Sequence, residues 1–164
     1  MQSNMDRIDR ILGNGKYRHY LELNKDAETG RIFCRHDMGH FLDVARIGWI
    51  LVLEEGLPIE KETVYAAALL HDIGRHLQYA EGVPHEKASA ALALEILKEC
   101  GFDDKETDVI IRAIGKHRDR NAEKEENLNG ILYRADKASR TCFCCEAEAM
   151  CDWKQDKKNK RILY

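Results

Sequence analysis

The most informative residues of this chain are His71 and Asp72, which close the apolar segment 64–70. Burying neutral polar groups without partners costs roughly 2–7 kcal/mol each, and burying a carboxylate costs more. A divalent metal ion offsets this cost, because imidazole nitrogen and carboxylate oxygen are both good ligands for first-row metals. For an isolated pair, helix capping is the simpler explanation, with Asp72 binding backbone amides before Gly74. The other residues of ligand type decide between these two interpretations.

Such residues recur at the ends or on the buried faces of neighbouring predicted helices. His40 lies early on an amphipathic segment, one turn before an apolar residue of its buried stripe. His85 opens the helix after the dipeptide, His117 closes the following one, and Asp136 lies inside a later helix. Each residue alone is more simply structural. Their recurrence on successive helices favours a shared metal site.

Three motifs in this order resemble the HD-domain metal-dependent phosphohydrolase superfamily. They are His40-Phe-Leu-Asp-Val-Ala45, Ala68-Leu-Leu-His-Asp-Ile-Gly74 and Arg134-Ala-Asp-Lys137. The resemblance covers roughly residues 36–140 and implies an all-α fold. It also implies one metal ion held by His40, His71, Asp72 and Asp136. The histidines in the middle of the pattern resemble those of the dinuclear subgroup, which implies a second metal ion held by Asp72, His85 and His117.

The resemblance implies a hydrolase that cleaves a phosphate ester or anhydride of a nucleotide or related small molecule by attack of a metal-bound hydroxide. Two cations about 3.5–4 Å apart lower the pKa of a shared hydroxide and stabilise the oxygens of an in-line displacement. A mixed histidine and carboxylate set suits iron, manganese, cobalt, nickel or zinc better than magnesium. Two alternatives stay open: a di-iron oxygenase with the same helical ligand set, and a nucleotide-binding regulatory module.

Cationic side chains beside the ligands are expected to hold the anionic substrate in a catalytic role. Arg75 directly follows the dipeptide, and Lys116 and Arg118 flank His117. Adjacent residues on a helix point in different directions, so these cations need not all face one cavity. The competing explanation for each of them is a solvated charge or a weak surface ion pair.

Two more histidines lie close to this pattern. His76 is a candidate to protonate the leaving group, although a loop histidine bonded to a nearby carbonyl explains it equally well. His36 precedes His40 by one helical turn, and we expect it beside the ligands or at the surface.

The composition is that of a soluble protein with one compact domain: 164 residues, 44% hydrophobic and 34% charged. No apolar run approaches the roughly 20 residues that span a bilayer, and the start lacks the apolar segment of a signal peptide. We therefore expect a cytoplasmic protein without a membrane partner. The formal net charge of −3 argues against a nucleic-acid partner. A small-molecule phosphate is the expected partner, and a homo-oligomer stays open.

The elements that must position the ligands are predicted to be helices, because apolar residues recur at helical spacing and only two prolines interrupt the chain. We expect a single all-α bundle of about six to eight helices over residues 1–164, with its core at about 36–140. The N-terminal helices within 1–30 and the tail 141–164 are extensions, and a loop is expected over 77–84. The predicted helices cover about residues 8–13, 17–23, 37–55, 60–72, 85–100, 103–117 and 128–140.

The tail carries four closely spaced cysteines, Cys142, Cys144, Cys145 and Cys151. Four thiolates are able to hold zinc or an iron–sulfur cluster. The second half of a C-x-x-C…C-x-x-C pattern is missing, however, and two of the four cysteines are direct neighbours. Free thiols on a helix are therefore favoured over a structural metal. Cys34 and Cys100 stand alone and are expected to be core thiols.

Overall fold

The computed structural model describes residues 5–164, and this part of the chain contains helices and no β-strand. The all-α prediction is therefore confirmed, as is the expected helix number. No helix in the described part is long and apolar enough to cross a membrane. The α-helices are α1 (Asp6–Gly13), α2 (Gly15–Ala27), α3 (Met38–Glu55), α4 (Lys61–Leu70), α5 (Arg75–Glu81), α6 (His85–Glu99), α7 (Asp104–Lys116) and α8 (Leu128–Ala138). Short 3₁₀ helices are η1 (Arg120–Lys124), η2 (Cys142–Cys144), η3 (Glu148–Met150) and η4 (Gln155–Lys157).

Side chains that accept backbone N–H groups fix the starts of several helices. The Asn14 side chain caps α2, and Asp103 with Glu106 forms a capping box at the start of α7. At the start of α3, Asp37 accepts the backbone N–H of His40 at 3.2 Å. This last cap fixes the first turn of α3, and with it the predicted ligand His40.

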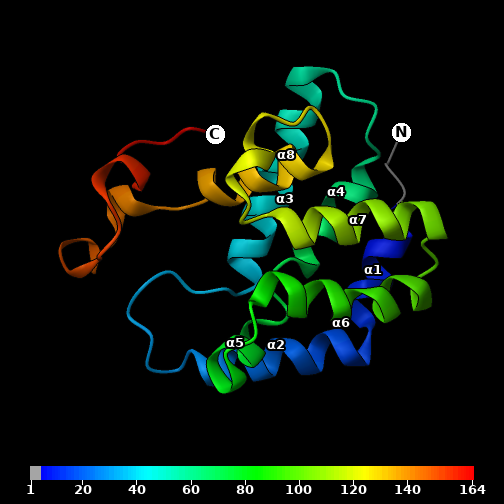
Figure 1. Ribbon diagram of the computed structural model, residues 1–164, viewed down its shortest axis with the longest axis horizontal. Coiled ribbons are helices and arrows are strands. Elements are labelled where there is room, and N and C mark those ends of the chain that lie inside the picture. Colours follow the sequence, from blue (N-terminus) through cyan, green and yellow to red (C-terminus); the bar gives the residue numbers. More distant parts are fainter. Residues whose placement is uncertain (1–4) are drawn as a thin grey trace.

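Helix α4 is the central helix of the bundle and packs against α1, α3, α6, α7 and α8 (Figure 1). Seven of its ten residues are buried, because apolar side chains from these neighbours surround it. The helix consequently ends inside the molecule rather than at its surface. His71 and Asp72 follow it directly and are both almost inaccessible to solvent. Two polar side chains in such a place require polar or cationic partners.

The turn after Asp72 lies directly against α6. A Cβ atom on Gly74 would meet the backbone nitrogen of Ser89 at 2.5 Å and the carbonyl carbon of Ala88 at 2.8 Å. The Gly74 N–H also donates to Ser89 Oγ at 2.9 Å. Only glycine allows this close approach, which fixes His85 at the start of α6 relative to the His71-Asp72 dipeptide.

Residues 75–81 form α5, so the predicted loop over 77–84 is wrong for residues 77–81. Gly82 ends the helix in the left-handed region, with φ of 73°. None of the seven helical residues is buried. The helix therefore has no apolar stripe that sequence periodicity could have detected.

The tail 141–164 lies to one side of the helical body (Figure 1) and contains only the single-turn helices η2, η3 and η4. Of the tail cysteines predicted to lie on a helix, Cys142 and Cys144 lie on the single-turn helix η2, while Cys145 and Cys151 directly follow η2 and η3. The prediction of a helix is therefore wrong for Cys145 and Cys151. The prediction of core thiols is confirmed for the buried Cys100 and is wrong for Cys34. Cys34 is exposed because it lies on the connector 28–37 between α2 and α3, outside the packed helices.

Candidate metal centre

The ends of four helices meet around Asp72. The start of α3 carries His40, the end of α4 is followed by His71, the start of α6 carries His85, and the end of α7 is followed by His117. Within the described residues, two groups of possible metal ligands have atoms that all lie within 4.8 Å of one another. One group is His40, His71 and Asp72, and the other is Asp72, His85 and His117.

The two carboxylate oxygens of Asp72 face different histidine pairs. Its Oδ2 lies 3.3 Å from His71 Nε2 and 3.7 Å from His40 Nε2. Its Oδ1 lies 3.1 Å from His85 Nε2 and 3.6 Å from His117 Nε2. The carboxylate therefore stands between two half-sites, with one oxygen directed to each.

The Nδ1 atoms of three of these histidines have hydrogen-bond acceptors. Nδ1 of His71 lies 2.7 Å from the Ala68 carbonyl oxygen, and Nδ1 of His117 lies 2.7 Å from that of Ile114. Nδ1 of His85 lies 2.5 Å from the side-chain oxygen of Gln78. A carbonyl oxygen only accepts, so each of these Nδ1 atoms carries the proton and each neutral ring has a lone pair on Nε2.

The Nε2 atoms meet in pairs. The distance between them is 3.3 Å for His40 and His71 and 3.2 Å for His85 and His117. When both rings of a pair are neutral with the proton on Nδ1, their Nε2 lone pairs face each other, and a metal cation between them can bind both. Asp72 Oδ1 is also buried without a hydrogen-bond partner. These residues fit first-row divalent metal ions, which take exactly such nitrogen and oxygen donors.

Asp136 lies on the His40 side of the site. Its Oδ1 is 3.5 Å from His40 Nε2 and 3.7 Å from His71 Nε2, while its Oδ2 accepts from Lys137 Nζ at 2.6 Å. Burial by itself lowers the pKa of His71, but the carboxylates of Asp72 and Asp136 raise it to about 10. The site therefore has a strongly negative field that attracts cations, as a metal centre requires.

Arg75 is the predicted substrate-binding cation that the fold brings to these ligands. Its Nε lies 3.4 Å from Asp72 Oδ1, and one of its terminal nitrogens lies 2.7 Å from His36 Nε2. Since α5 starts at Arg75, the side chain leaves the helix at its first position and reaches back into the site.

The other predicted catalytic residues have partners elsewhere. Nδ1 of His76 lies 3.0 Å from the side-chain oxygen of Asn24, and its ring stacks on another aromatic ring of α2. Lys116 pairs with Glu125 at 3.2 Å, and the exposed Arg118 lies 3.6 Å from a carboxylate oxygen of α6. Their catalytic roles stay predictions, because these contacts do not join them to the metal ligands.

The carboxylate that holds His36 was not predictable from the sequence. Glu28 accepts the backbone N–H of His36 at 2.9 Å, and its other oxygen lies 2.5 Å from His36 Nδ1. The Tyr79 hydroxyl donates to the same carboxylate at 2.8 Å. Burial raises the pKa of Glu28, but its hydrogen bonds with His36 outweigh this and lower it to about 2. The spacing of His36 and His40 marked the histidine as a neighbour of the ligands, whereas nothing in the sequence marked Glu28.

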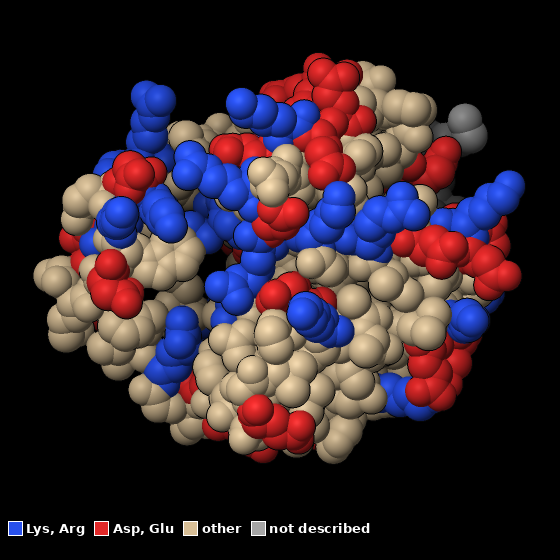
Figure 2. Space-filling model, viewed as in Figure 1, with Lys and Arg blue, Asp and Glu red and all other residues tan. Residues whose placement is uncertain are grey.

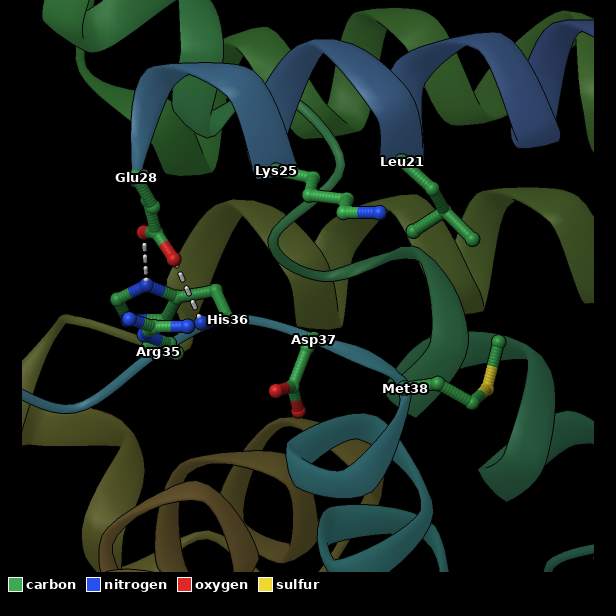
Figure 3. A pocket seen from close by; sticks show the side chains of 7 residues that line it. All are labelled: Leu21, Lys25, Glu28, Arg35, His36, Asp37 and Met38. Atoms are coloured by element: carbon green, nitrogen blue, oxygen red, sulfur yellow. Dashed lines mark hydrogen bonds and ion pairs between the residues drawn. The ribbon is translucent and has the colours of Figure 1, made fainter. Parts of the chain in front are cut away.

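This buried pair borders both the metal centre and a cavity. His36 Nε2 lies 3.8 Å from Asp72 Oδ2. Figure 3 shows Glu28 and His36 at one side of a cavity of about 320 Å³ that is also lined by Lys25 and by apolar side chains of α2 and α3. The His36 side chain therefore contacts this cavity as well as the metal centre.

Asn24 of α2 anchors the turn that carries the ligands. Its side-chain nitrogen donates to the backbone carbonyl of Asp72 at 2.9 Å, and its oxygen accepts the backbone N–H of His76 at 2.8 Å. The side chain is almost completely buried. A buried polar group left without its partner costs about 1–3 kcal/mol.

We expect Asn24→Ala to lower the free energy of unfolding by about 1–3 kcal/mol, because the carbonyl of Asp72 and an N–H of α5 lose their partner. Metal affinity should fall as well, because the turn that presents Asp72 is no longer anchored. Denaturant unfolding and metal titration measure both effects. The exposed Asn121, whose side chain makes no such bridge, provides the control variant Asn121→Ala. Equal stability of both variants would contradict the anchoring role.

A family model for the HD domain matches residues 38–141, which include all the predicted metal ligands. The chain therefore belongs to the HD-domain family. An uncharacterized protein of Clostridium beijerinckii is 45% identical over 160 residues, which are 98% of this chain and 100% of that protein.

More distant relatives match this chain over a small part of their own length. Ribonuclease Y of Borreliella burgdorferi is 29% identical over 119 residues, covering 70% of this chain and 21% of that enzyme. Ribonuclease Y of Mycoplasma mycoides is 31% identical over 102 residues, covering 62% of this chain and 18% of that enzyme. The chain thus spans about a fifth of the length of these enzymes. A crystal structure of a predicted HD superfamily hydrolase from an uncultured Thermotogales bacterium has a TM-score of 0.62 and 23% identity, covering 86% of this chain and 80% of that one. It shows that the fold is shared.

Proposed function

We propose that this protein is a metal-dependent phosphohydrolase that cleaves a phosphate ester or anhydride of a nucleotide or related small molecule. We further propose that its centre holds two transition-metal ions that share Asp72. One observation carries the proposal: the two oxygens of the Asp72 carboxylate face different histidine pairs. Oδ2 faces the Nε2 atoms of His40 and His71, and Oδ1 faces those of His85 and His117. A single ion would need only one of these half-sites.

When bound, such a pair of ions lowers the pKa of water and stabilises the oxygens of an in-line displacement at phosphorus. The residues of the chain then have separate tasks. His40, His71 and Asp136 would hold one ion, His85 and His117 would hold the other, and Asp72 would supply one oxygen to each. The Nδ1–H bonds of His71, His85 and His117 keep the Nε2 atoms of these three rings directed into the centre.

Arg75 is the group that we assign to the phosphate. Its planar guanidinium is suited to bidentate binding of phosphate oxygens. His36 accepts a hydrogen bond from it, and Glu28 in turn orients His36, so the guanidinium is held in place before substrate arrives. Figure 2 shows further Lys and Arg side chains along the border between the helical body and the tail, where they favour the approach of an anion.

A panel of phosphate compounds tests this function. Metal-loaded protein is assayed on nucleoside mono-, di- and triphosphates, dinucleoside polyphosphates, cyclic nucleotides and a short RNA, because the name ribonuclease Y indicates an RNA substrate for those relatives. We expect release of phosphate or nucleotide from a small-molecule substrate. Preferred cleavage of RNA would replace the proposed substrate class. Oxygen consumption by the iron-loaded, reduced protein, with no hydrolysis, would instead identify an oxygenase.

We expect Arg75→Ala to lower kcat/KM by about 10- to 100-fold, because a charge-assisted hydrogen bond to phosphate is worth about 1.5–3 kcal/mol. Arg75→Lys should recover part of the loss, since it restores the charge without the bidentate geometry. Steady-state kinetics and metal content measure the effect, and metal content should stay unchanged. Arg112→Ala is the matched control because Arg112 is an exposed residue of α7. An unchanged kcat/KM in Arg75→Ala would remove Arg75 from the substrate site.

A further inference from the structure

Five cysteines lie in two segments at one edge of the molecule. The connector 28–37 carries Cys34, and the tail carries the other four (Figure 1). All of them are free thiols. None of them contributes to the metal centre formed by His40, His71, Asp72, His85, His117 and Asp136, which we call the histidine centre.

The tail arranges three of its cysteines along a series of tight turns. In the first turn, the N–H of Cys145 donates to the carbonyl of Cys142 at 3.3 Å. Two further turns, at Glu148, connect Cys145 to Cys151. The Sγ of Cys144 donates instead to a backbone carbonyl of the same turn at 3.5 Å. The C-x-x-C pair and Cys151 are therefore the candidate ligands, and Cys144 is not one of them.

The connector carries a cysteine that could supply a fourth ligand, Cys34. Although Cys34 as a whole residue is exposed, partial desolvation of its sulfur raises the pKa of the thiol, and the nearby thiols of Cys142 and Cys145 raise it further. Such an effect acts through space and requires that the groups lie close together, although more than 100 residues separate them in the sequence. A hydrogen bond of 2.7 Å from Arg31 Nε to the Cys34 carbonyl supports the local conformation of the connector.

Two cations accompany these thiols. Lys158 is buried, and its Nζ donates to the carbonyl oxygens of Glu148 and Cys151 at 3.1 and 3.3 Å. Arg140 stacks over the Trp153 ring at 3.8 Å and acts on the Cys34 thiol as a nearby positive charge. Four thiolates around a divalent ion leave a net charge of −2. Lys158 also pairs with the Glu148 carboxylate at 3.0 Å, and Lys160 pairs with the same oxygen, so this group carries one net positive charge and Arg140 a second, which together offset the thiolates.

The tail lacks the apolar core that would otherwise order it. Ala147 and Lys158 are its buried residues, while Phe143, Met150 and Trp153 are each more than 40% exposed. Ordering one residue costs roughly 1–2 kcal/mol in backbone entropy. Small segments with so little apolar burial commonly obtain their stability from a structural metal ion.

We propose that Cys34, Cys142, Cys145 and Cys151 form a tetrahedral zinc site that joins the connector to the tail. Each thiol releases its proton to solvent on binding, and no group is oxidised or reduced. No three of these sulfur atoms lie within 4.8 Å of one another in the described residues, so zinc must draw the two segments closer together. The connector also carries His36 two residues after Cys34, so the zinc would hold this wall of the histidine centre in place.

Cobalt substitution tests the site separately from the histidine centre. After metal removal, wild-type protein titrated with Co²⁺ should develop sulfur-to-cobalt charge-transfer absorption, which nitrogen and oxygen ligands do not produce. Cys34→Ser should lose most of this absorption and about one zinc ion per chain. Cys144→Ser should retain the absorption and this zinc ion. Asp72→Ala should retain the absorption, although it loses the ions of the histidine centre. Full absorption in Cys34→Ser, or an equal loss in Cys144→Ser, would overturn the proposal.

Thiol counting provides a second measurement that needs no variant. With zinc bound, the native protein should expose one reactive thiol, that of Cys144, because Cys100 is buried. A chelator should raise the number to about five. The same number of reactive thiols before and after chelation would mean that the cysteines do not bind metal.

Discussion

Asp72→Ala should empty both halves of the histidine centre and lower phosphohydrolase activity by roughly a thousand-fold or more, since the metal ions supply the main stabilisation of the reacting oxygens. Each oxygen of this carboxylate faces a different histidine pair, so in the proposed dinuclear centre its removal would take one ligand from each ion. Elemental analysis should show about two fewer ions per chain than in the wild type, and the hydrolysis assay should show the loss of activity.

Two other ligand variants make this result specific. His85→Ala and Asp136→Ala each remove a ligand from one half-site, so each should lose about one ion. Asp108→Ala, at an exposed position of α7, should change neither metal content nor activity. If Asp72→Ala lost only one ion, Asp72 would not be shared, and the centre would have to be described as two independent sites.

Gly74→Ala should lower the free energy of unfolding by about 1–3 kcal/mol or more, the usual cost of forcing an extra methyl group into a packed interior. The added Cβ would lie 2.5 Å from the backbone nitrogen of Ser89. Backbone atoms cannot rotate away as a side chain can, so α6 must shift. Because His85 begins α6, affinity for the second metal ion should also fall. Chemical denaturation and metal titration measure the two effects.

Gly115→Ala is the matched control for this substitution. Gly115 lies in α7 with no heavy atom within 4 Å of the position of a Cβ. Alanine in a helix interior is more favourable than glycine by roughly 0.5–1 kcal/mol, so the control should be slightly stabilised. A similar small gain in Gly74→Ala would contradict the close approach of the turn to α6.

The fold was predictable because its central helix has an unmistakable sequence. The segment 66–70 is apolar on all sides and ends directly at two polar residues, which is typical of a buried helix that presents ligands. The remaining ligands were predictable because they stand at the starts and ends of helices with clear apolar periodicity. Those helix ends meet around Asp72, as the family resemblance implied.

The residues that support the ligands were not predictable from the sequence. Asn24 bonds to a carbonyl 48 residues away, and it lies on a polar helix where an asparagine is usually exposed. Glu28 likewise follows a polar helix, so the sequence predicts an exposed side chain. It is buried because the connector folds back over it. Such contacts depend on how helices pack, and no local pattern of residue types records them. For the same reason, the partners of Lys116 and Arg118 could not be known in advance.

The hydrogen bonds of Asn24 have a consequence for where the working unit of this protein begins. The segment shared across the family starts at residue 38, yet the carbonyl of Asp72 is bound by a side chain that precedes it by 14 residues. Glu28 and His36, which stand behind Arg75, also precede that segment. A fragment trimmed to the shared segment would retain every proposed metal ligand. It would lose the side chains of Asn24, Glu28 and His36, whose hydrogen bonds hold the turn at Asp72 and the side chain of Arg75 in place. The smallest competent piece must therefore include α2.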